Sequence, residues 1–251
     1  MALFDWLRRG RARAPEPPTA EAAASHARLD AWWATIGRVG PDLLAAFVNP
    51  AFGGGPMWPG WRRAFRVVRR GDATILATDG LSDPFLGEPP EVNGLGLELF
   101  VETSDIPPSC LGTEEDVAPL ARSWAFALLA HVGDLVAGEG EGFAETLDRY
   151  GVISIEIPGA DEQPALQQLP PGFIIGDGAI GVLIGAPAPD FRALIDDMPL
   201  TAVRIVPVVL LRADELEAIR DGGGEARRAI AERLGAAPSR HRSSLSRPSV
   251  A

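Results

Sequence analysis

Apolar and polar positions along the chain fall into short runs that predict a protein of both strands and helices. Runs with two-residue alternation or many β-branched residues are typical of strands, and Arg70-Gly71-Asp72 between two such runs is typical of a hairpin turn. Residues 202–211 are almost continuously apolar, so we expect this strand at the centre of the sheet. The full set of expected strands covers residues 64–69, 73–78, 96–102, 152–158, 172–177, 179–184 and 202–211.

Apolar residues at helical spacing mark a second set of segments. Thr19 precedes an alanine-rich segment in which Leu29, Trp32 and Ile36 recur at helical intervals. Helices are expected at residues 20–36, 41–48, 117–137 and 214–220, with a last helix ending at Leu234. Because helices and strands do not alternate strictly, we predict an α/β protein of the α+β type: a single domain with helices packed on a mixed, largely antiparallel sheet.

Composition gives the expected domain boundaries. Residues 1–19 are expected to be a flexible leader and linker, and residues 20–234 the folded domain. Residues 235–251 are rich in Ser, Arg and Pro, and we expect a disordered basic tail. Cys110 is the only cysteine, which excludes an intrachain disulfide and a cysteine-based metal cluster and fits a reducing cytoplasm. No run approaches the roughly 18 apolar residues of a membrane helix.

The net charge of −11 favours a protein partner of opposite charge. Arginines gather at both ends of the chain, so its middle is more acidic than this sum shows. An acidic body repels nucleic acid, whose binding needs clustered basic groups, and steers basic proteins toward itself. All 23 basic residues are arginine, which excludes a Schiff-base or phosphate-loop lysine and indicates a GC-rich bacterial source.

The strand expected at residues 96–102 carries the main candidate site. Its odd-numbered positions are aliphatic, and its other face carries Glu98, Phe100 and Glu102. That face is either solvated, as in many half-buried strands, or a contact face. In a contact face, an aromatic anchor between two acids would bind a basic or extended partner.

Four carboxylates leave a chemical alternative open. Asp79, Asp83, Glu98 and Glu102 could form a divalent-cation site or supply the acid and base of a hydrolase. The spacing of a calcium loop does not occur here, and Asp79-Gly80 is a common turn dipeptide. The sequence also contains no Gly-x-Ser-x-Gly motif.

Three blocks of sequence share the order and spacing of a known domain. They are residues 78–83 (Thr-Asp-Gly-Leu-Ser-Asp), residues 96–100 (Gly-Leu-Glu-Leu-Phe), and residues 203–216, a strand followed by a helix that opens with Asp214. The pattern extends over residues 40–235 and resembles the suppressor-of-fused (SUFU-like) domain family, here as a bacterial stand-alone member.

The resemblance implies an α/β fold built on a mixed sheet and a binding role in place of catalysis. The animal member of the family is a two-domain inhibitor that clamps an extended segment of a transcription factor, and this chain lacks room for the second domain. Bacterial relatives occur as stand-alone domains, for which the resemblance implies the role of an immunity protein that neutralises a toxin.

We therefore expect a cytoplasmic, non-enzymatic protein-binding module without a cofactor. It would be an immunity-type inhibitor of a basic toxin or another basic protein, with no nucleic-acid partner. The expected partner-binding residues are Asp79, Ser82, Asp83, Glu98, Phe100 and Glu102. Two alternatives stay open: a carboxylate-dependent hydrolase or divalent-metal enzyme that uses the four acids, and a scaffold tethered by its basic tail.

Overall fold

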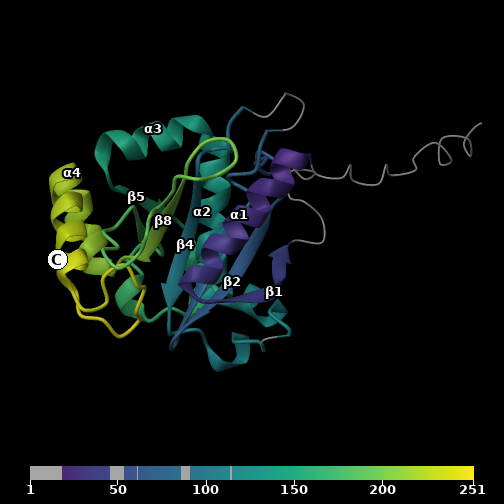
Figure 1. The fold of residues 1–251 in the computed structure, drawn as a ribbon. Coiled ribbons are helices and arrows are strands. Elements are labelled where there is room, and N and C mark those ends of the chain that lie inside the picture. Colours follow the sequence, from purple (N-terminus) through teal and green to yellow (C-terminus); the bar gives the residue numbers. More distant parts are fainter. Residues whose placement is uncertain (1–18, 46–53, 61, 86–90, 114) are drawn as a thin grey trace, which may run out of the picture.

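A mixed sheet runs through the middle of the protein with helices on both faces (Figure 1). The computed structural model describes residues 19–45, 54–60, 62–85, 91–113 and 115–251. The strands are β1 (Arg38–Ala45), β2 (Ala64–Arg70), β3 (Ala73–Asp79), β4 (Leu97–Thr103), β5 (Ile153–Ile157), β6 (Ile180–Ile184), β7 (Leu194–Ile195) and β8 (Val203–Leu210). The helices are α1 (Ala20–Ile36), α2 (Trp124–Glu139), α3 (Glu141–Tyr150) and α4 (Ala213–Ala236).

The strand order confirms the predicted α+β fold. The sheet runs β1-β2-β3-β4-β8-β6-β5, and β7 pairs with β8 outside this path. Among these strands only β4 and β8 pair in parallel, and the other neighbours are antiparallel. The apolar strand β8 lies between β4 on one side and β6 on the other, at the centre as predicted.

Two helical layers enclose the sheet. On one face, the aliphatic positions of β4 pack with α2 in the largest apolar cluster, to which α3 also contributes. On the other face, α1 places Trp32 and Trp33 against Phe100 and Ile75, and α4 covers the half of the sheet near β6. The two-residue alternation expected for β4 is confirmed, because Leu97, Leu99 and Val101 belong to one apolar cluster and Phe100 belongs to the other.

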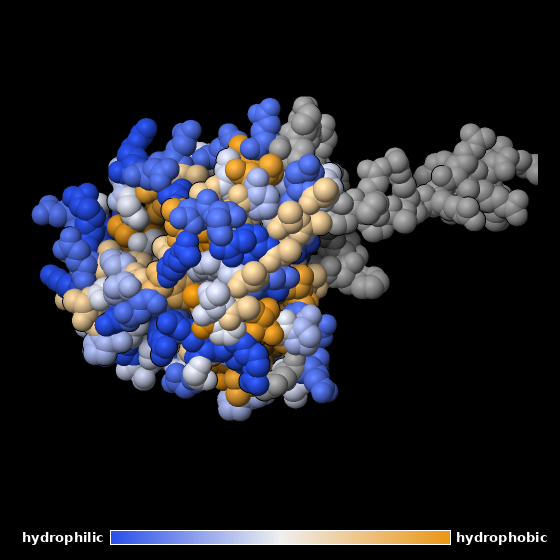
Figure 2. All heavy atoms as spheres, viewed as in Figure 1, coloured by the Kyte–Doolittle hydropathy of each residue, from blue (hydrophilic) through white to orange (hydrophobic). Residues whose placement is uncertain are grey.

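The first helix begins and ends where the sequence predicts. The Thr19 side chain accepts a hydrogen bond from the Ala22 N–H, the usual N-cap arrangement. Leu29, Trp32 and Trp33 are buried on the sheet, and the outward positions are mostly alanine. A pale orange ridge therefore follows α1 across an otherwise largely hydrophilic face (Figure 2).

The helix expected at residues 41–48 is wrong over its described part, which belongs to strand β1. This strand pairs with β2, and its register shifts between Val39 and Leu43. Pro41 lies within that irregularity, at the edge of the sheet, where a residue without an N–H costs no ladder hydrogen bond. Pairing with the hairpin β2-β3 outweighs the local helix signal. Residues 46–48 of the expected helix lie outside the described residues.

The hairpin expected from residues 172–177 and 179–184 is only half present. Residues 180–184 form β6, but its partners are β5 and β8. Pro171–Phe173 is a 3-10 turn, because two prolines precede the apolar run and exclude a regular strand there. Helix α3 and the short strand β7 were not predicted.

The tail expected to be disordered is packed on the domain. Within residues 235–251, α4 extends to Ala236, and His241, Ser243 and Arg247 further along are buried. The composition of this segment predicts disorder only for the segment alone, and its order here comes from acidic residues elsewhere in the chain. The expected leader at residues 1–18 lies outside the described residues. Among the described helices, none is long and apolar enough to cross a membrane.

Replacing Trp33 by Ala should lower the free energy of unfolding by about 3–5 kcal/mol, since the ring is fully buried against Phe100 and Phe191. Urea denaturation measures this loss. Tyr150→Ala is the control, because Tyr150 is 47% exposed and its truncation should cost less than about 1 kcal/mol. Similar losses for the two variants would contradict the placement of α1 on the sheet.

Candidate functional site

All six candidate residues are buried. Their exposed fractions range from 0% for Asp79, Glu98, Phe100 and Glu102 to 5% for Asp83, with Ser82 at 3%. The strand face that carries Glu98, Phe100 and Glu102 is therefore neither solvated nor an open contact face. Whether these residues contact a partner stays a prediction, because the segments that cover them would first have to move.

Glu98 holds the connection between β3 and β4. Its Oε1 accepts hydrogen bonds from the Gly80 N–H (3.0 Å), the Ser82 N–H (2.9 Å) and the Ser82 hydroxyl (2.7 Å). Its Oε2 accepts from the Thr78 hydroxyl at 2.5 Å. The motif at residues 78–83 thus winds around one carboxylate, which explains why its polar residues lie inside the protein.

Burial, with the nearby charge of Asp79, raises the pKa of Glu98, although the hydrogen bonds from Thr78 and Ser82 oppose this shift. A protonated Glu98 would still be satisfied. Its Oε2–H could donate to the Thr78 Oγ1, while the Thr78 hydroxyl turns to the Leu99 carbonyl, 3.4 Å away. This group is therefore suited to hold a loop and poorly suited to serve as an exposed anion.

Gly80 is required by the same turn. Its φ of +150° lies in a region that favours glycine, and a Cβ at this position would lie 1.9 Å from the Arg62 carbonyl oxygen. The dipeptide Asp79-Gly80 accordingly shapes the backbone, as its composition indicates.

Asp79 and Asp83 form a buried ionic network that reaches helix α1. The Arg62 guanidinium donates to both carboxylates, at 2.5 Å to Asp79 and 2.9 Å to Asp83. The network continues from Asp83 to the His26 ring (2.8 Å) and from Asp79 to Arg66 (2.6 Å). The sequence pattern does not reveal these basic partners, because they lie 13 or more residues from the acids that they bind.

Burial by itself would raise the pKa of Asp83, but the hydrogen bonds from Arg62 and His26 outweigh it and lower that pKa to about 2. The pKa of Arg62 is raised, because its bonds and charge interactions with Asp83 and Asp79 outweigh the desolvation that would lower it. Asp83 and Arg62 therefore stay charged at neutral pH.

Glu102 lies at the other end of β4, about 13 Å along the strand from Glu98. Its carboxylate is bound by His241 (2.9 Å), Arg242 (2.9 Å) and Arg70 (3.1 Å). Burial would raise its pKa, but the hydrogen bond with His241 and the nearby charges of Arg242 and Arg70 lower it. Phe100, between the two acids, stacks on Phe191 at a centroid distance of 4.5 Å.

The four acids do not form one site. Asp79, Asp83 and Glu98 gather at the start of β4, whereas Glu102 is held at its far end by cations. Within the described residues, no group of three or more His, Cys, Asp or Glu side chains could hold a metal ion. The four acids therefore do not meet in the single cluster that the hydrolase and metal-enzyme alternative expects.

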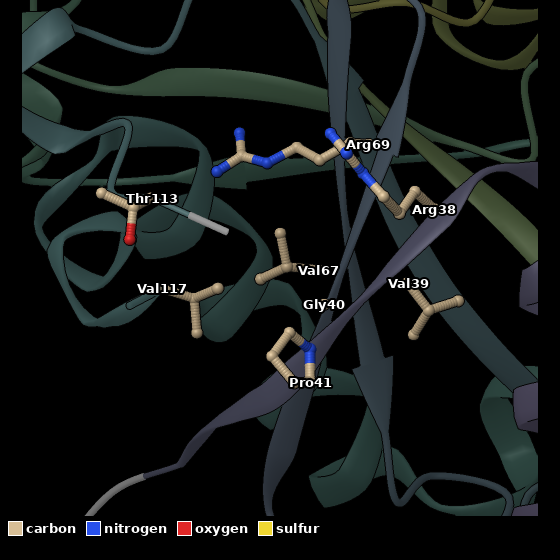
Figure 3. A pocket seen from close by; sticks show the side chains of 8 residues that line it. All are labelled: Arg38, Val39, Gly40, Pro41, Val67, Arg69, Thr113 and Val117. Carbon is tan, nitrogen blue, oxygen red and sulfur yellow. The ribbon is translucent and has the colours of Figure 1, made fainter. Parts of the chain in front are cut away.

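The surface is hollowed along the edge strand β1. A cavity of about 400 Å³ is lined by apolar side chains that include Leu43, Val117 and Phe126, together with the exposed acids Asp42 and Asp116. Arg63 also lines it, and its charge is paired with Asp134. A smaller hollow of about 60 Å³ adjoins it, and Figure 3 shows Val67 and Val117 beside Gly40 and Pro41 there. We call the larger cavity the β1 groove.

No family model and no curated protein matches the sequence. A comparison of structures, however, matches the chain to one described as "the Sufu-Fu complex crystal structure", with a TM-score of 0.56 and 15% sequence identity. The match covers 92% of this chain and 92% of the solved one. The protein has a SUFU-like fold. The fold implied by the three sequence blocks is thereby supported over nearly the whole chain, and the identity is too low to carry a function with it.

Glu98→Ala should lower the free energy of unfolding by about 3–5 kcal/mol, because it leaves buried N–H and hydroxyl donors of the turn without an acceptor. Glu98→Gln should cost no more than about 1 kcal/mol, since its amide can accept from Ser82 and Gly80 and donate to Thr78. Chemical denaturation compares them, with exposed Glu145→Ala as the control. Equal losses for Ala and Gln would contradict this role of Glu98.

Asp83 should make stability depend on pH under acidic conditions. A folded pKa of about 2 lies below the ordinary value of 3.8, so the contribution is present above that value and is lost as the pH falls toward 2. It amounts to about 2 kcal/mol. Urea denaturation across this range should show a smaller fall for Asp83→Asn than for the wild type. If the free energies of unfolding of the two proteins fall in parallel with pH, the Asp83 pKa is not lowered.

Proposed function

We propose that this protein is a non-enzymatic, cytoplasmic protein-binding module that inhibits a basic partner, in the manner of a bacterial immunity protein. The observation that carries the proposal is the SUFU-like fold, shared over 92% of the chain with a protein that was solved in a complex with Fu. The net charge of −11 supports a basic partner. A toxin is the partner class that the resemblance to bacterial SUFU-like domains implies.

The buried motif shapes the domain, and the contact surface that we propose is the β1 groove. Its volume of about 400 Å³ is large enough for several side chains of a partner. Leu43, which lines the groove, is 37% exposed, and the lining acids Asp42 and Asp116 are exposed as well. Apolar surface flanked by carboxylates suits a partner segment in which basic residues surround an apolar anchor.

The edges of the sheet support this choice. Strand β1 ends the sheet on one side, but Pro41 and the register shift make it a poor template for an added strand. Side-chain contacts in the groove are therefore favoured over main-chain pairing at β1. Strand β5 ends the sheet on the other side in regular register with β6, which keeps strand addition available there.

The test starts with tagged wild-type protein, which should capture a basic protein from the lysate of cells that carry the toxin. Asp42→Arg should weaken that complex by about tenfold or more while unfolding as the wild type does, because this side chain is exposed. Titration calorimetry with the captured protein measures the affinity.

The control is Glu145→Arg, which makes the same charge change at an exposed position on α3. An unchanged affinity in the groove variant would remove the groove from the proposal. An equal loss of affinity in both variants would mean that overall charge, and not the groove, determines binding. If the captured protein does not inhibit growth, or if co-expression of this chain does not restore it, the immunity role is wrong.

A further inference from the structure

Residues 237–251, which we call the strap, follow α4 without forming a helix or a strand. Figure 1 shows them as the yellow trace that leaves α4 and returns beside it. Their Ser, Arg and Pro content is that of a segment that does not fold alone. The order of the strap must therefore come from the surface that it lies on.

The first attachment of the strap is Glu102. The His241 Nε2 and the Arg242 Nε each lie 2.9 Å from this carboxylate, and the Ser243 N–H donates to the Glu102 main-chain carbonyl, also at 2.9 Å. The His241 ring packs edge-on against Phe100 and Phe191. Glu102 is fully buried, so the strap closes it off from water.

The second attachment is Glu215 on α4, which is also fully buried. Arg247 binds it through two nitrogens, each 2.6 Å from a carboxylate oxygen, and donates to the Leu210 carbonyl as well. The Val250 N–H donates to the same carboxylate at 2.9 Å. A forked ion pair of this kind recognises an arginine by geometry as well as charge.

The contacts between the two attachments are also polar. The Ser243 hydroxyl accepts from the Leu210 N–H at 3.0 Å, and the Leu245 N–H donates to the Asp105 carboxylate at 2.6 Å. Of the apolar side chains in the strap, Leu245 and Val250 pack against the apolar clusters, and both are partly buried. The strap is held as a peptide ligand is held, by side-chain and main-chain hydrogen bonds.

The rest of the domain keeps partners for both carboxylates when the strap is away. Arg70 still pairs with Glu102, and the Arg212 N–H still donates to Glu215 at 2.8 Å. Release of the strap therefore leaves each acid with one partner from the domain, but Glu102 loses Arg242 and Glu215 loses Arg247. With the strap released, two buried carboxylates lack their arginine partners. An extended segment that carries positive charges would restore these ion pairs.

We propose that the channel lined by Glu102, Asp105, Leu210 and Glu215 is a peptide-binding site that the strap occupies. In place of the strap it accepts an extended segment of a partner protein with cationic groups five residues apart, the spacing of Arg242 from Arg247. This site is separate from the β1 groove, and the inference does not rest on the proposed function.

Hydrogen exchange on the uncut protein is the first test. The amides of residues 241–250 should exchange about 100-fold or more faster than those of β8, through an opening that leaves the sheet intact. If they exchange only with global unfolding, the strap is part of the core and the proposal is wrong.

The second test uses a variant with a protease site inserted at the exposed Pro238, cut while folded. A labelled peptide of residues 239–251 should replace the cut strap, as measured by fluorescence anisotropy. A Gly/Ser peptide that keeps only His241, Arg242, Leu245 and Arg247 should compete with it. Absence of exchange in the folded, cut protein would overturn the proposal.

The matched peptides separate recognition from overall charge. Arg247→Met in the peptide should weaken binding by about 100-fold, because it leaves Glu215 buried without its cation. Arg240→Met removes the same charge at a position that pairs with the exposed Asp190, and should change binding by less than about threefold. Equal effects of the two changes would mean that the channel does not recognise Arg247.

Discussion

The buried carboxylate of Glu98 fixes the connection on which the centre of the sheet depends. It gathers donors from Thr78, Gly80 and Ser82, so the chain leaving β3 must turn back at this point and enter β4. Strand β4 then carries the parallel pairing with β8 that joins the two halves of the sheet. An apolar side chain at position 98 could fill the space, but it would leave those donors buried and unpaired.

Buried carboxylates also bind distant partners just after β3 and at the far end of β4. Asp83 draws in His26 of α1, and Glu102 draws in His241 near the C-terminal end. Each pair holds a covering element, α1 or the strap, at a defined position. The apolar contacts among Trp33, Phe100 and Phe191 would tolerate small shifts of these elements. A buried ion pair often gives no more net stability than well-packed apolar residues in its place, so the use of ion pairs here is consistent with positioning.

The parts of this structure that follow from local patterns could be predicted from the sequence. Thr19 and the spacing of Leu29 and Trp32 define α1, and the turn at residues 70–72 defines the hairpin β2-β3. Strand β1 could not be predicted in this way, because its conformation depends on pairing with β2.

The candidate site shows the same division. Two-residue periodicity places Glu98, Phe100 and Glu102 on one face of β4, but it says nothing about what covers that face. The covering comes from Trp33 and from His241, which lies 139 residues away from Glu102 in the sequence. The ionic partners of Asp79 and Asp83 are equally remote from any motif, so only the folded chain reveals that these acids are neutralised.

The unequal ends of the sheet bear on how this protein behaves at high concentration. An open-ended stack of molecules would need the β1 edge of one copy to pair with the β5 edge of the next. Pro41 and the irregular register at β1 oppose that contact. Among the described strands, the remaining contact between edges is β5 with β5, which closes as a two-fold pair and cannot grow into a fibre.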